Sequence, residues 1–510
     1  MSSDSPGTVY LVGAGPGDPG LITVRGVECL QRADVVLYDY LANEALLDHA
    51  PALARRICLG RHGAGRLISP EETQRLIVEE ATAGKTVVRL KSGDPMVFGR
   101  TAGELAAIEA AGLRYEIVPG VTAAAACATH AAALLTSRDD SSAVALVTGR
   151  EAEKAEAALD FDALARFPGS LVFYMGVTSA DDWTSQLMAH GMASETPVAL
   201  VRRCTYPDQK VWHTKLSAAA ELIRRERIRP PVAAIVGPAG KQPTQASWFE
   251  RRPLFGVSVL VARPADQAAS LAKPLAELGA RVLVQPAISI DPPSDWSQVD
   301  DAVARLGEFA WVVFSSANGV RFFLDRLHEL GRDPRALATC RIAAIGPGTA
   351  AALREFCLNA DLTPAEFRAE SLASELAPQA VGSRCLLVRA SRGRDVLPNM
   401  LIEAGVDVEQ VVAYRSTDVT RPDEQIAAAL AAGEIDYVAV TSSAIARSLA
   451  GLFGESLTHS RLATISPITS DAVREAGCSP AVEAVRYDMP GLVAAICRDV
   501  ATRRSGAADR

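Results

Sequence analysis

An apolar run that ends in a cluster of glycines opens the patterned part of the chain. Residues 9–12 read Val-Tyr-Leu-Val, and Gly13, Gly15 and Gly17 follow at alternate positions. The run predicts a buried strand. Glycine permits positive φ and lets a ligand approach the main chain closely, so a loop of this kind at the carboxyl end of a parallel strand is a natural nucleotide seat. The chain is therefore predicted to fold around a ligand-binding loop.

This loop departs from the dinucleotide-binding fingerprint at one position. In GxGxxG the third glycine would fall where Asp18 stands. A carboxylate there would repel a pyrophosphate, so the loop favours a neutral or cationic ligand and disfavours NAD. An NAD-dependent oxidoreductase is the alternative that NADH binding would reveal, and an ordinary tight turn is the alternative without a ligand.

Length and composition indicate the fold class. At 510 residues the chain exceeds one ordinary core, so two or more domains are expected. Hydrophobic residues make up 49% and aromatic residues 5%, which is typical of α/β proteins whose parallel strands are buried on both faces. No apolar window reaches about 18 residues and no signal-peptide pattern opens the chain, so we expect a cytoplasmic protein without a membrane partner.

Cysteine, histidine and charge usage exclude further classes. Nine cysteines and seven histidines are scattered without CxxC or HExxH, so neither disulfides nor a metal site is indicated. The net charge is −8, and neither half of the chain is basic. Binding to nucleic acid is therefore not expected.

Short β-rich runs alternate with helical periodicity from Thr8 to about Gly237, which predicts α/β architecture. A helix is expected to begin after Ser69, because Ser69 can cap it, Pro70 suits its first turn and Glu72 can complete a capping box. Functional residues collect where parallel strands end, so the glycine-bearing strand ends predict a shared cleft. The strands are expected at 9–12, 35–38, 57–59, 86–90, 115–118, 143–148, 171–175, 198–201 and 233–236.

Five motifs in this region, in this order and spacing, resemble the tetrapyrrole methyltransferases, and most closely the uroporphyrinogen III C-methyltransferases. They are GAGPGDPGLIT, RLKSGDPMVFGR, VPGVTAA, LVFYMG and TPVALVRRCTYPDQK. The resemblance covers about Thr8 to Pro238. It implies two α/β subdomains with S-adenosylmethionine folded between them, and a homodimer through this half. Carried over by position, the cofactor contacts are Gly15, Pro16, Ser92, Gly93, Asp94, Val97, Thr122, Ala123, Met175, Cys204 and Ala233 or Ala234.

The residue types suit this cofactor. A sulfonium is cationic and needs carbonyl dipoles and carboxylates, while adenine and ribose need an apolar slot with hydroxyl and carboxylate partners. Asp94 and Thr122 offer such partners, and Met175 can pack on a ring. Methyl transfer depends mainly on in-line placement of two reactants, so few catalytic groups are required.

Three further residues are expected to act on the tetrapyrrole. After methylation of a porphyrinogen carbon a proton must leave, and Asp39 occupies the position that the family uses for the base, with a helix cap before Leu41 as the alternative. Where some relatives have lysine, Arg61 is a poor proton donor that would instead hold a substrate carboxylate. Arg100 is expected to grip an acetate or propionate bidentately, or else to be a solvated arginine at a helix start. The segment 101–103 departs from the GRGGEE of the family, which keeps a methyltransferase for a later corrin intermediate as an alternative.

A polar, proline-bearing stretch at 240–254 predicts a linker, after which a second α/β series begins. This series contains an internal repeat in two copies. Each copy is a strand ending in paired hydroxyls at a helix start, followed by a strand ending in a short turn, which predicts two similar α/β lobes. Hydroxyls and free N–H groups at helix starts can seat carboxylates, although capping alone would also explain the serine pairs. The copies are VVFSSANGV (312–320) with IAAIGPGTAAALRE (342–355), and VAVTSSAIA (438–446) with LATISPITSDAVRE (462–475).

This arrangement, together with VARP at 261–264, LLVRA at 386–390 and VVAYR at 411–415, resembles the uroporphyrinogen III synthases over about 255 to 500. The resemblance implies one lobe of 255–288 with 418–500, a second of 290–415, and a cleft between them. It implies a reaction without a cofactor: hydroxymethylbilane loses water, its last pyrrole is inverted through a spiro intermediate, and the ring closes. Tyr414 would assist departure of the hydroxyl, unless it is a core residue. Substrate carboxylates would be held by Arg263, Ser315, Ser316, Thr349, Arg389, Thr441, Ser442 and Thr469.

The two resemblances together predict a bifunctional enzyme of tetrapyrrole biosynthesis. Residues 8–239 would be the methyltransferase, adding two methyl groups to uroporphyrinogen III to give precorrin-2, a product that leads toward sirohaem or cobalamin. Residues 255–500 would be the synthase, a lyase that makes the substrate for the first reaction. The alternative is a methyltransferase for a later corrin intermediate fused to a non-catalytic, two-lobed tetrapyrrole-binding module.

Overall fold

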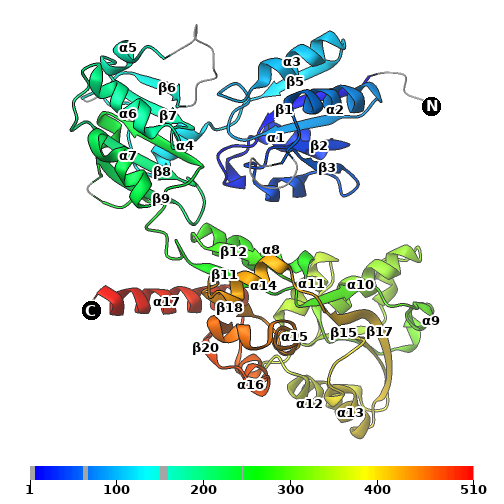
Figure 1. Cartoon of the computed structure of the whole chain (residues 1–510). Helices are drawn as coiled ribbons and strands as arrows, with labels where there is room; N and C mark the ends of the chain where they lie inside the picture. Colours follow the sequence, from blue (N-terminus) through cyan, green and yellow to red (C-terminus); the bar gives the residue numbers. More distant parts are fainter. Residues whose placement is uncertain (1–5, 61–66, 140, 150–158, 244, 509–510) are drawn as a thin grey trace. The chain divides into compact units, whose positions relative to one another are not determined.

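The structure is a computed structural model that describes residues 6–60, 67–139, 141–149, 159–243 and 245–508. Internal contacts divide the chain into two compact units. The N-terminal unit holds residues up to 257 together with 276–281, and the C-terminal unit holds 258–275 and the residues from 282 onward. Each unit contains two five-stranded sheets flanked by helices (Figure 1). The predicted α/β class is confirmed.

The first sheet of the N-terminal unit is parallel throughout. Its strands lie in the order β3-β2-β4-β1-β5, so their carboxyl ends meet at one edge. The central strand β4 is buried at every residue. The strands are β1 (Thr8–Gly13), β2 (Val35–Tyr38), β3 (Arg55–Cys58), β4 (Val87–Lys91) and β5 (Arg114–Val118), and the helices are α1 (Val24–Gln31), α2 (Pro70–Thr82) and α3 (Thr101–Ala110), with 3-10 turns at Pro19–Leu21 and Glu44–His49.

Helix α2 begins where the sequence predicts. The Ser69 side chain accepts a hydrogen bond from the Glu72 N–H at 3.1 Å, and Pro70 stands in the first turn, where its missing N–H has no intrahelical partner to lose. Ile77 and Ala81 on its apolar face are fully buried and pack with residues of β1, β2 and β4. The predicted cap is confirmed.

The second sheet of the N-terminal unit is mixed. Its order is β6-β7-β10-β8-β9; β6 and β7 are parallel and the other neighbours are antiparallel. The sequence predicted every strand of this sheet except β9, an edge strand in which only two consecutive residues, Val211 and Trp212, are apolar. The strands are β6 (Val144–Thr148), β7 (Ser170–Tyr174), β8 (Pro197–Arg202), β9 (Lys210–Lys215) and β10 (Val232–Val236), and the helices are α4 (Ala123–His130), α5 (Phe161–Ala165), α6 (Ala180–Ala189) and α7 (Leu216–Arg225), with a 3-10 turn at Pro238–Gly240.

The stretch at 240–254, which the sequence suggested as a linker, belongs to the N-terminal unit. Phe249 is buried and its ring lies 4.7 Å from the His130 ring, measured between centroids. The Trp248 indole N–H donates to the Thr129 carbonyl at 3.1 Å. The neighbouring aromatic side chains of Trp248 and Phe249 thus attach this stretch to α4, although its sequence carries no periodic pattern.

The C-terminal unit contains two sheets, which define its two lobes. Lobe one has the sheet β12-β11-β18-β19-β20 and combines both ends of the region, while lobe two has β13-β17-β16-β14-β15 from its middle. Lobe one comprises β11 (Ser258–Val261), α8 (Ala265–Glu277), β12 (Arg281–Val284), α14 (Glu424–Ala431), β18 (Tyr437–Val440), α15 (Ser443–Phe453), β19 (Arg461–Thr464), α16 (Pro467–Glu475), β20 (Pro480–Glu483) and α17 (Met489–Ala508), with a 3-10 segment η7 at Gly454–His459. Lobe two comprises β13 (Ile288–Asp291), α9 (Ser297–Ala304), β14 (Trp311–Phe314), α10 (Ala317–Glu329), β15 (Arg341–Ala344), α11 (Pro347–Glu355), α12 (Ala369–Ala380), β16 (Arg384–Ala390), α13 (Val396–Glu403) and β17 (Asp407–Asp418), with 3-10 turns at Leu306–Glu308 and Pro334–Leu337.

The internal sequence repeat corresponds to two strand–helix pairs in each lobe. In lobe two β14 leads into α10 and β15 into α11, and in lobe one β18 leads into α15 and β19 into α16. One serine in each copy caps a helix: Ser316 Oγ accepts from the Gly319 N–H at 3.0 Å, and Ser442 Oγ from the Ile445 N–H at 3.2 Å. The prediction of two similar α/β lobes is confirmed.

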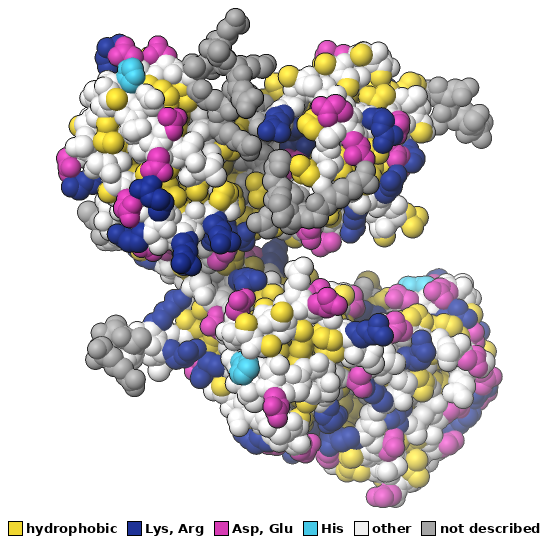
Figure 2. Space-filling model, viewed as in Figure 1, with side chains coloured by type: hydrophobic (Ala, Val, Ile, Leu, Met, Phe, Trp, Pro, Cys, Tyr) yellow, Lys and Arg dark blue, Asp and Glu magenta, His cyan; other side chains and the backbone are white. Residues whose placement is uncertain are grey.

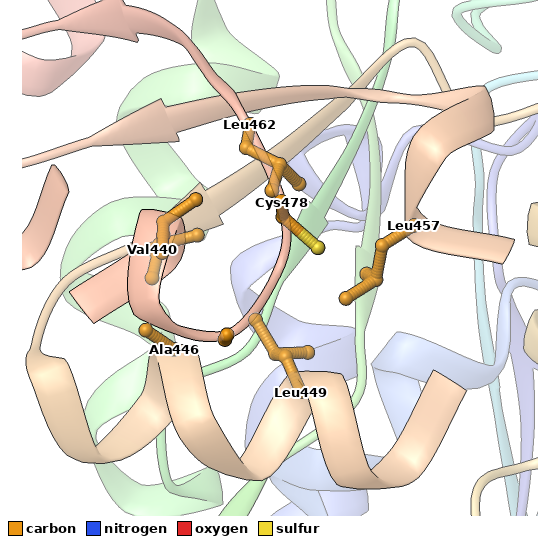
Figure 3. Close-up of a pocket in the computed structure, with 8 residues that line it drawn as sticks. Val440, Ala446, Leu449, Leu457, Leu462 and Cys478 are labelled. Carbon is orange, nitrogen blue, oxygen red and sulfur yellow. The ribbon is translucent and has the colours of Figure 1, made fainter. Parts of the chain in front are cut away.

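An apolar pocket lies inside the core of lobe one (Figure 3). Side chains from β18, α15, η7 and β19 point toward one another around it, and most of them belong to the hydrophobic core cluster of the lobe. Its lining offers no charged group, so the pocket is a packing space of the core. The lining residues are Val440, Ala446, Leu449, Leu457, Leu462, Val473, Ala476 and Cys478.

None of the described helices is long and apolar enough to cross a bilayer. On the face drawn in Figure 2, basic and acidic side chains are intermixed over both units. This distribution agrees with the near balance of charges in the sequence.

The last helix, α17, is attached to lobe one through a carboxylate. Asp499 accepts a hydrogen bond from the Tyr437 hydroxyl at 2.5 Å and from two nitrogens of the Arg461 guanidinium, Nε and Nη2, each at 2.8 Å. Partial burial by itself would raise the pKa of Asp499, but the hydrogen bonds from Arg461 and Tyr437 outweigh it and hold that pKa below its ordinary value.

We expect the substitution Asp499→Asn to destabilise the C-terminal unit in a pH-dependent way. Because the pKa of Asp499 is lower in the folded state, its stabilisation is present above the unfolded pKa and is lost as pH falls through the folded pKa. The free energy of unfolding should drop by about 1–3 kcal/mol at pH 7, and the difference from wild type should narrow below about pH 4. Denaturant titrations at several pH values measure this.

The matched control for this variant is Asp471→Asn, which removes an exposed carboxylate from an i,i+3 pair with Arg474 on the surface of the same lobe. Its effect should stay within about 0.5 kcal/mol. Equal stability of Asp499→Asn and wild type at pH 7 would contradict the proposed attachment of α17.

Candidate functional sites

Three glycine loops meet at the carboxyl edge of the first sheet. Gly15, after β1, and Gly93, after β4, exchange backbone hydrogen bonds of 3.2 and 2.8 Å. Gly120, after β5, lies so close to both loops that a Cβ on it would overlap the Gly93 carbonyl and stand 2.8 Å from Gly13 Cα. A side chain at Gly120 has no room, so the three loops form a seat walled by main chain.

Asp94 ties these loops to one another. One carboxyl oxygen accepts from the Gly120 N–H at 3.0 Å and the other from the Met96 N–H at 2.8 Å. The sequence suggested Asp94 as a ligand partner. In the structure it bonds the loops after β4 and β5, and the remaining lone pairs of its carboxylate are what it can offer a ligand.

The second sheet reaches this seat through Tyr174 at the end of β7. Its hydroxyl lies 2.7 Å from Thr122 Oγ1 and accepts the Ala124 N–H at 2.8 Å, and its ring centroid lies 5.0 Å from that of Phe98. The next residue, Met175, has φ of +55° and is 48% exposed. A left-handed conformation is uncommon outside glycine and costs free energy, so Met175 holds a strained backbone conformation in the loop that follows β7.

The other predicted cofactor residues lie in the same surroundings. Cys204 and Ala233 are buried in one apolar cluster with Ala124 and Cys127 of α4. Ala233 stands opposite Tyr174 in the antiparallel pair of β10 and β7. The structure therefore brings together predicted residues from both subdomains. Pro16, Ser92 and Val97 lie within the loops already described, and Ala123 is the first residue of α4.

A loop of the second sheet also packs against the first glycine loop. Thr205, after β8, accepts the Asp18 N–H at 2.9 Å, and a Cβ on Gly17 would overlap the Tyr206 ring. Asp18 has a local role as well, because its side chain accepts the Gly20 N–H at 2.8 Å and caps the 3-10 turn that follows. Helix capping therefore accounts for the residue that breaks the dinucleotide fingerprint.

Asp39 lies at the same sheet edge, after β2. One carboxyl oxygen accepts from Arg89 Nη2 at 2.5 Å and the other from the Ser92 N–H at 3.0 Å. Its side chain is 32% exposed. The alternative that the Asp39 side chain caps the turn before Leu41 is wrong. Asp39 instead contacts the loop of Ser92 and Gly93, which is part of the glycine seat.

Three charged side chains are buried behind Asp39. Glu104 accepts from Arg89 Nε at 2.9 Å and from Lys91 Nζ at 2.5 Å. The side chain of Arg89 is 6% exposed, that of Lys91 1% and that of Glu104 8%. Burial, together with the Arg89 charge, lowers the pKa of Lys91 against the opposing effect of Glu104. Sequence analysis missed this network, although two basic residues in a strand expected to be buried require buried partners.

The two predicted arginines differ in what the structure shows. Arg61 lies outside the described residues. Arg100 is exposed at the start of α3 and has φ of +54°. None of the residues within the described ranges forms an ion pair with it, so its guanidinium is available to a carboxylate. The next residue, Thr101, donates its hydroxyl to the Pro95 carbonyl and so ties the start of α3 to the loop.

In the C-terminal unit, Tyr414 joins the core of lobe two to the start of α10. Its ring is 7% exposed and stacks on Phe322 at 5.8 Å between centroids, while its hydroxyl lies 3.0 Å from Ser316 Oγ. Burial raises the pKa of Tyr414, with hydrogen bonds to Ser316 and Asn318 opposing it. The hydroxyl therefore stays protonated at neutral pH and able to donate a hydrogen bond.

A chain of amide groups links this tyrosine to lobe one. Arg263, after β11, donates to Gln267 at 3.1 Å, and the Gln267 amide donates to Asn318 Oδ1 on α10 at 2.8 Å. Arg263 is half-buried, and burial lowers its pKa. The structure thus brings together Arg263, Ser316 and Tyr414 from the predicted set, joined by two amides that sequence analysis missed.

The remaining predicted carboxylate ligands are partly engaged within the protein. Ser315 donates its hydroxyl to the Val388 carbonyl at 3.1 Å, and Arg389 contacts Asp395 at 2.6 Å and Gln410 at 2.7 Å. Thr349 and Thr469 are buried in the first turns of α11 and α16. Thr441 is half-buried at the end of β18, beside the Ser442 cap.

Comparison with known families explains this pairing of sites. The tetrapyrrole (corrin/porphyrin) methylase model matches residues 8–220, and the uroporphyrinogen-III synthase HemD model matches 269–494. The chain is thus a bifunctional tetrapyrrole enzyme that joins a methylase to a synthase. It belongs to the family of the porphyrin biosynthesis protein HemD of Ruminiclostridium josui, to which it is 33% identical over 439 residues, or 86% of this chain and 87% of that protein.

Two further similarities cover parts of the chain. The uroporphyrinogen-III C-methyltransferase of Bacillus subtilis is 35% identical over 339 residues, 66% of this chain and 69% of that protein. A structure of uroporphyrin-III C-methyl transferase from Thermus thermophilus, complexed with S-adenyl homocysteine, is 36% identical and covers 46% of this chain and 98% of that one, with a TM-score of 0.40. The chain spans about half the length, 52–54%, of the siroheme synthases that it also matches.

We expect Gly120→Ala to abolish the seat between the three loops. The added methyl group meets main-chain atoms of Gly93 and Gly13, which cannot move aside as a flexible side chain would. Binding of S-adenosylhomocysteine should weaken at least about 100-fold, or about 2.7 kcal/mol. Calorimetric titration measures this. Gly103→Ala in α3 is the control, because its methyl group meets only the end of the Gln74 side chain. Unchanged binding in Gly120→Ala would show that the ligand lies elsewhere.

Proposed function

We propose that the C-terminal unit converts hydroxymethylbilane to uroporphyrinogen III, and that the N-terminal unit transfers two methyl groups from S-adenosylmethionine to that product to give precorrin-2. The observation that carries the methyltransferase assignment is the meeting of Gly13, Gly15, Gly93 and Gly120 between two subdomains, beside a partly exposed carboxylate. The family and the relatives named above support both reactions.

The residues at this seat fit S-adenosylmethionine. A seat with main-chain walls offers carbonyl dipoles to a cation, while the apolar cluster around Cys204 and Ala233 suits an adenine ring. When bound, the cofactor supplies an electrophilic methyl group. Met175 is exposed and can contact the cofactor, and the chain's main task is to place the two reactants in line.

Asp39 and Arg100 act on the tetrapyrrole in this proposal. Methylation leaves the macrocycle with a positive charge, which is removed when a neighbouring bridging carbon gives up its proton. The Asp39 carboxylate accepts that proton, and the C–H electron pair returns to the ring system. Arg100 binds an acetate or propionate group through its exposed guanidinium. Arg61 holds a second carboxylate of the substrate in the same way.

Tyr414 and the residues around it carry the synthase reaction. The protonated Tyr414 hydroxyl donates a hydrogen bond to the terminal hydroxyl of hydroxymethylbilane as its C–O bond breaks. The departing hydroxyl takes up a proton and leaves as water, and the electron pair of the pyrrole nitrogen stabilises the cation that remains. Arg263, Arg389 and the hydroxyls of Ser315, Ser316, Thr349, Thr441, Ser442 and Thr469 bind the carboxylates of the bilane. Holding both ends of the flexible chain together is the larger contribution, because ring closure is intramolecular.

The proposal includes the organisation suggested by the sequence. Residues 8–239 form the methyltransferase and 255–500 the synthase, with a cytoplasmic location, a homodimer through the methyltransferase, and neither a metal nor NAD. The similarity to uroporphyrinogen-III C-methyltransferases supports it over a methyltransferase for a later corrin intermediate.

Both activities are tested in one incubation. We expect purified protein and freshly generated hydroxymethylbilane to give the type III isomer alone, and a dimethylated product once S-adenosylmethionine is added. Chromatography and mass spectrometry after oxidation distinguish the products. Type I isomer alone would mean that ring closure was spontaneous and that the C-terminal unit only binds tetrapyrroles.

The two reactions should be separable by substitution. Tyr414→Phe removes the hydroxyl near Ser316 and should lower type III formation about 100-fold, while methylation of supplied uroporphyrinogen III stays unchanged. Tyr487→Phe, which removes an exposed hydroxyl in the same unit, is the control and should leave both rates unchanged. Full synthase activity in Tyr414→Phe would exclude the proposed role of the hydroxyl.

A further inference from the structure

A balanced set of four charged side chains lies between the core of the first sheet and the glycine seat. Asp39 and Glu104 are acidic, and Arg89 and Lys91 are basic. Arg89, Lys91 and Glu104 are almost fully buried, whereas Asp39 is about one-third exposed. Asp39 is therefore the member of this network that a substrate can contact.

Arg89 is the connection between the buried part and Asp39. Its Nη2 donates to Asp39 Oδ1 at 2.5 Å, its Nε donates to Glu104 Oε1 at 2.9 Å, and its Nη1 donates to the Leu90 carbonyl at 3.1 Å. Three directions of the planar guanidinium are thus occupied. A guanidinium that is hydrogen-bonded at three points is fixed in one orientation. It therefore also fixes the orientation of the Asp39 carboxylate.

Neutralising Glu104 does not require Arg89. Lys91 Nζ already contacts Glu104 Oε2 at 2.5 Å, and it is the more deeply buried of the two cations. The hydrogen bond from Arg89 to Asp39 is therefore not needed to neutralise Glu104, and we look for its role at Asp39. Asp39 also accepts the Ser92 N–H, so its two oxygens are fixed from opposite partners, one on β4 and one in the glycine seat.

We propose that Arg89, held by Glu104 and Lys91, is the positioning residue that orients the Asp39 carboxylate toward the proton that the methylated macrocycle loses. This inference rests on the proposed function of Asp39 as the base. A base displaced by about 1 Å from its proton loses on the order of 100-fold in rate, which is what loss of the fork should produce.

A double-mutant cycle tests the proposal. We expect Asp39→Asn and Arg89→Met each to lower kcat for methylation of uroporphyrinogen III about 100-fold, with KM for both substrates and Kd for S-adenosylhomocysteine changed less than about threefold. The double variant should be no slower than Asp39→Asn alone, because Arg89 acts only through Asp39. A residue with a merely structural role would add its loss to that of Asp39.

Two further variants keep the result interpretable. Arg89→Met leaves Glu104 paired with Lys91, so no buried carboxylate is abandoned. If this variant does not bind S-adenosylhomocysteine, Arg89→Lys takes its place in the cycle, since lysine keeps the charge but lacks the fork. Arg25→Met, which removes a two-nitrogen contact to Glu116 on the surface of the same unit, is the control and should leave kcat unchanged.

The outcomes separate this inference from the proposed function. Full kcat in Asp39→Asn would overturn the assignment of Asp39 as the base, whatever Arg89 does. Low kcat in Asp39→Asn together with full kcat in a folded Arg89 variant would overturn the positioning role alone. Additive losses in the double variant would also overturn it, and a non-additive loss supports it.

Discussion

The close approach of Gly13, Gly93 and Gly120 is the constraint on which the N-terminal unit depends. Parallel strands deliver their loops to one edge of a sheet, but side chains normally keep those loops apart. Where Cβ atoms are missing, the main chains come into contact, and Asp94 can bond across from one loop to the next. The seat therefore exists because three positions lack a side chain, and Asp39 and Thr122 take their places around it as a consequence.

The predicted ligand residues of the C-terminal unit are arranged differently from the glycine loops of the N-terminal unit. Its sites lie at helix starts, where free N–H groups and hydroxyls gather, and two of the serines are used in part as caps. What singles out one helix start is Tyr414, whose ring belongs to the core while its hydroxyl meets Ser316. The amides of Gln267 and Asn318 then connect this point to Arg263 on the other lobe. Polar groups on both lobes suit the proposed substrate, hydroxymethylbilane, because it is long, acidic and flexible.

Much of the architecture was predictable from local pattern. Apolar runs such as 9–12 and 233–236 lie in strands, and Ser69 caps α2, because burial and capping depend on residues close in sequence. The edge strand β9 was missed because it has only two apolar residues in succession and no period-2 alternation. The Arg89–Glu104 network was missed for another reason: the two residues are fifteen positions apart, and their partnership follows from how α3 packs on β4. The roles of Asp39, Arg100 and Tyr414 stay predictions.

The sequence by itself determined where the strands end, which strand ends carry glycine, and which two families the halves resemble. These properties follow from residue order alone, since backbone freedom and burial are set by each residue and its neighbours. Only the tertiary structure decided that Arg89 rather than a residue near in sequence faces Asp39, that Asp18 and Ser316 are caps, and that Tyr174 joins the two sheets of the N-terminal unit. Such pairings depend on distances between segments far apart in the chain, and hydrogen bonds act only over about 3 Å.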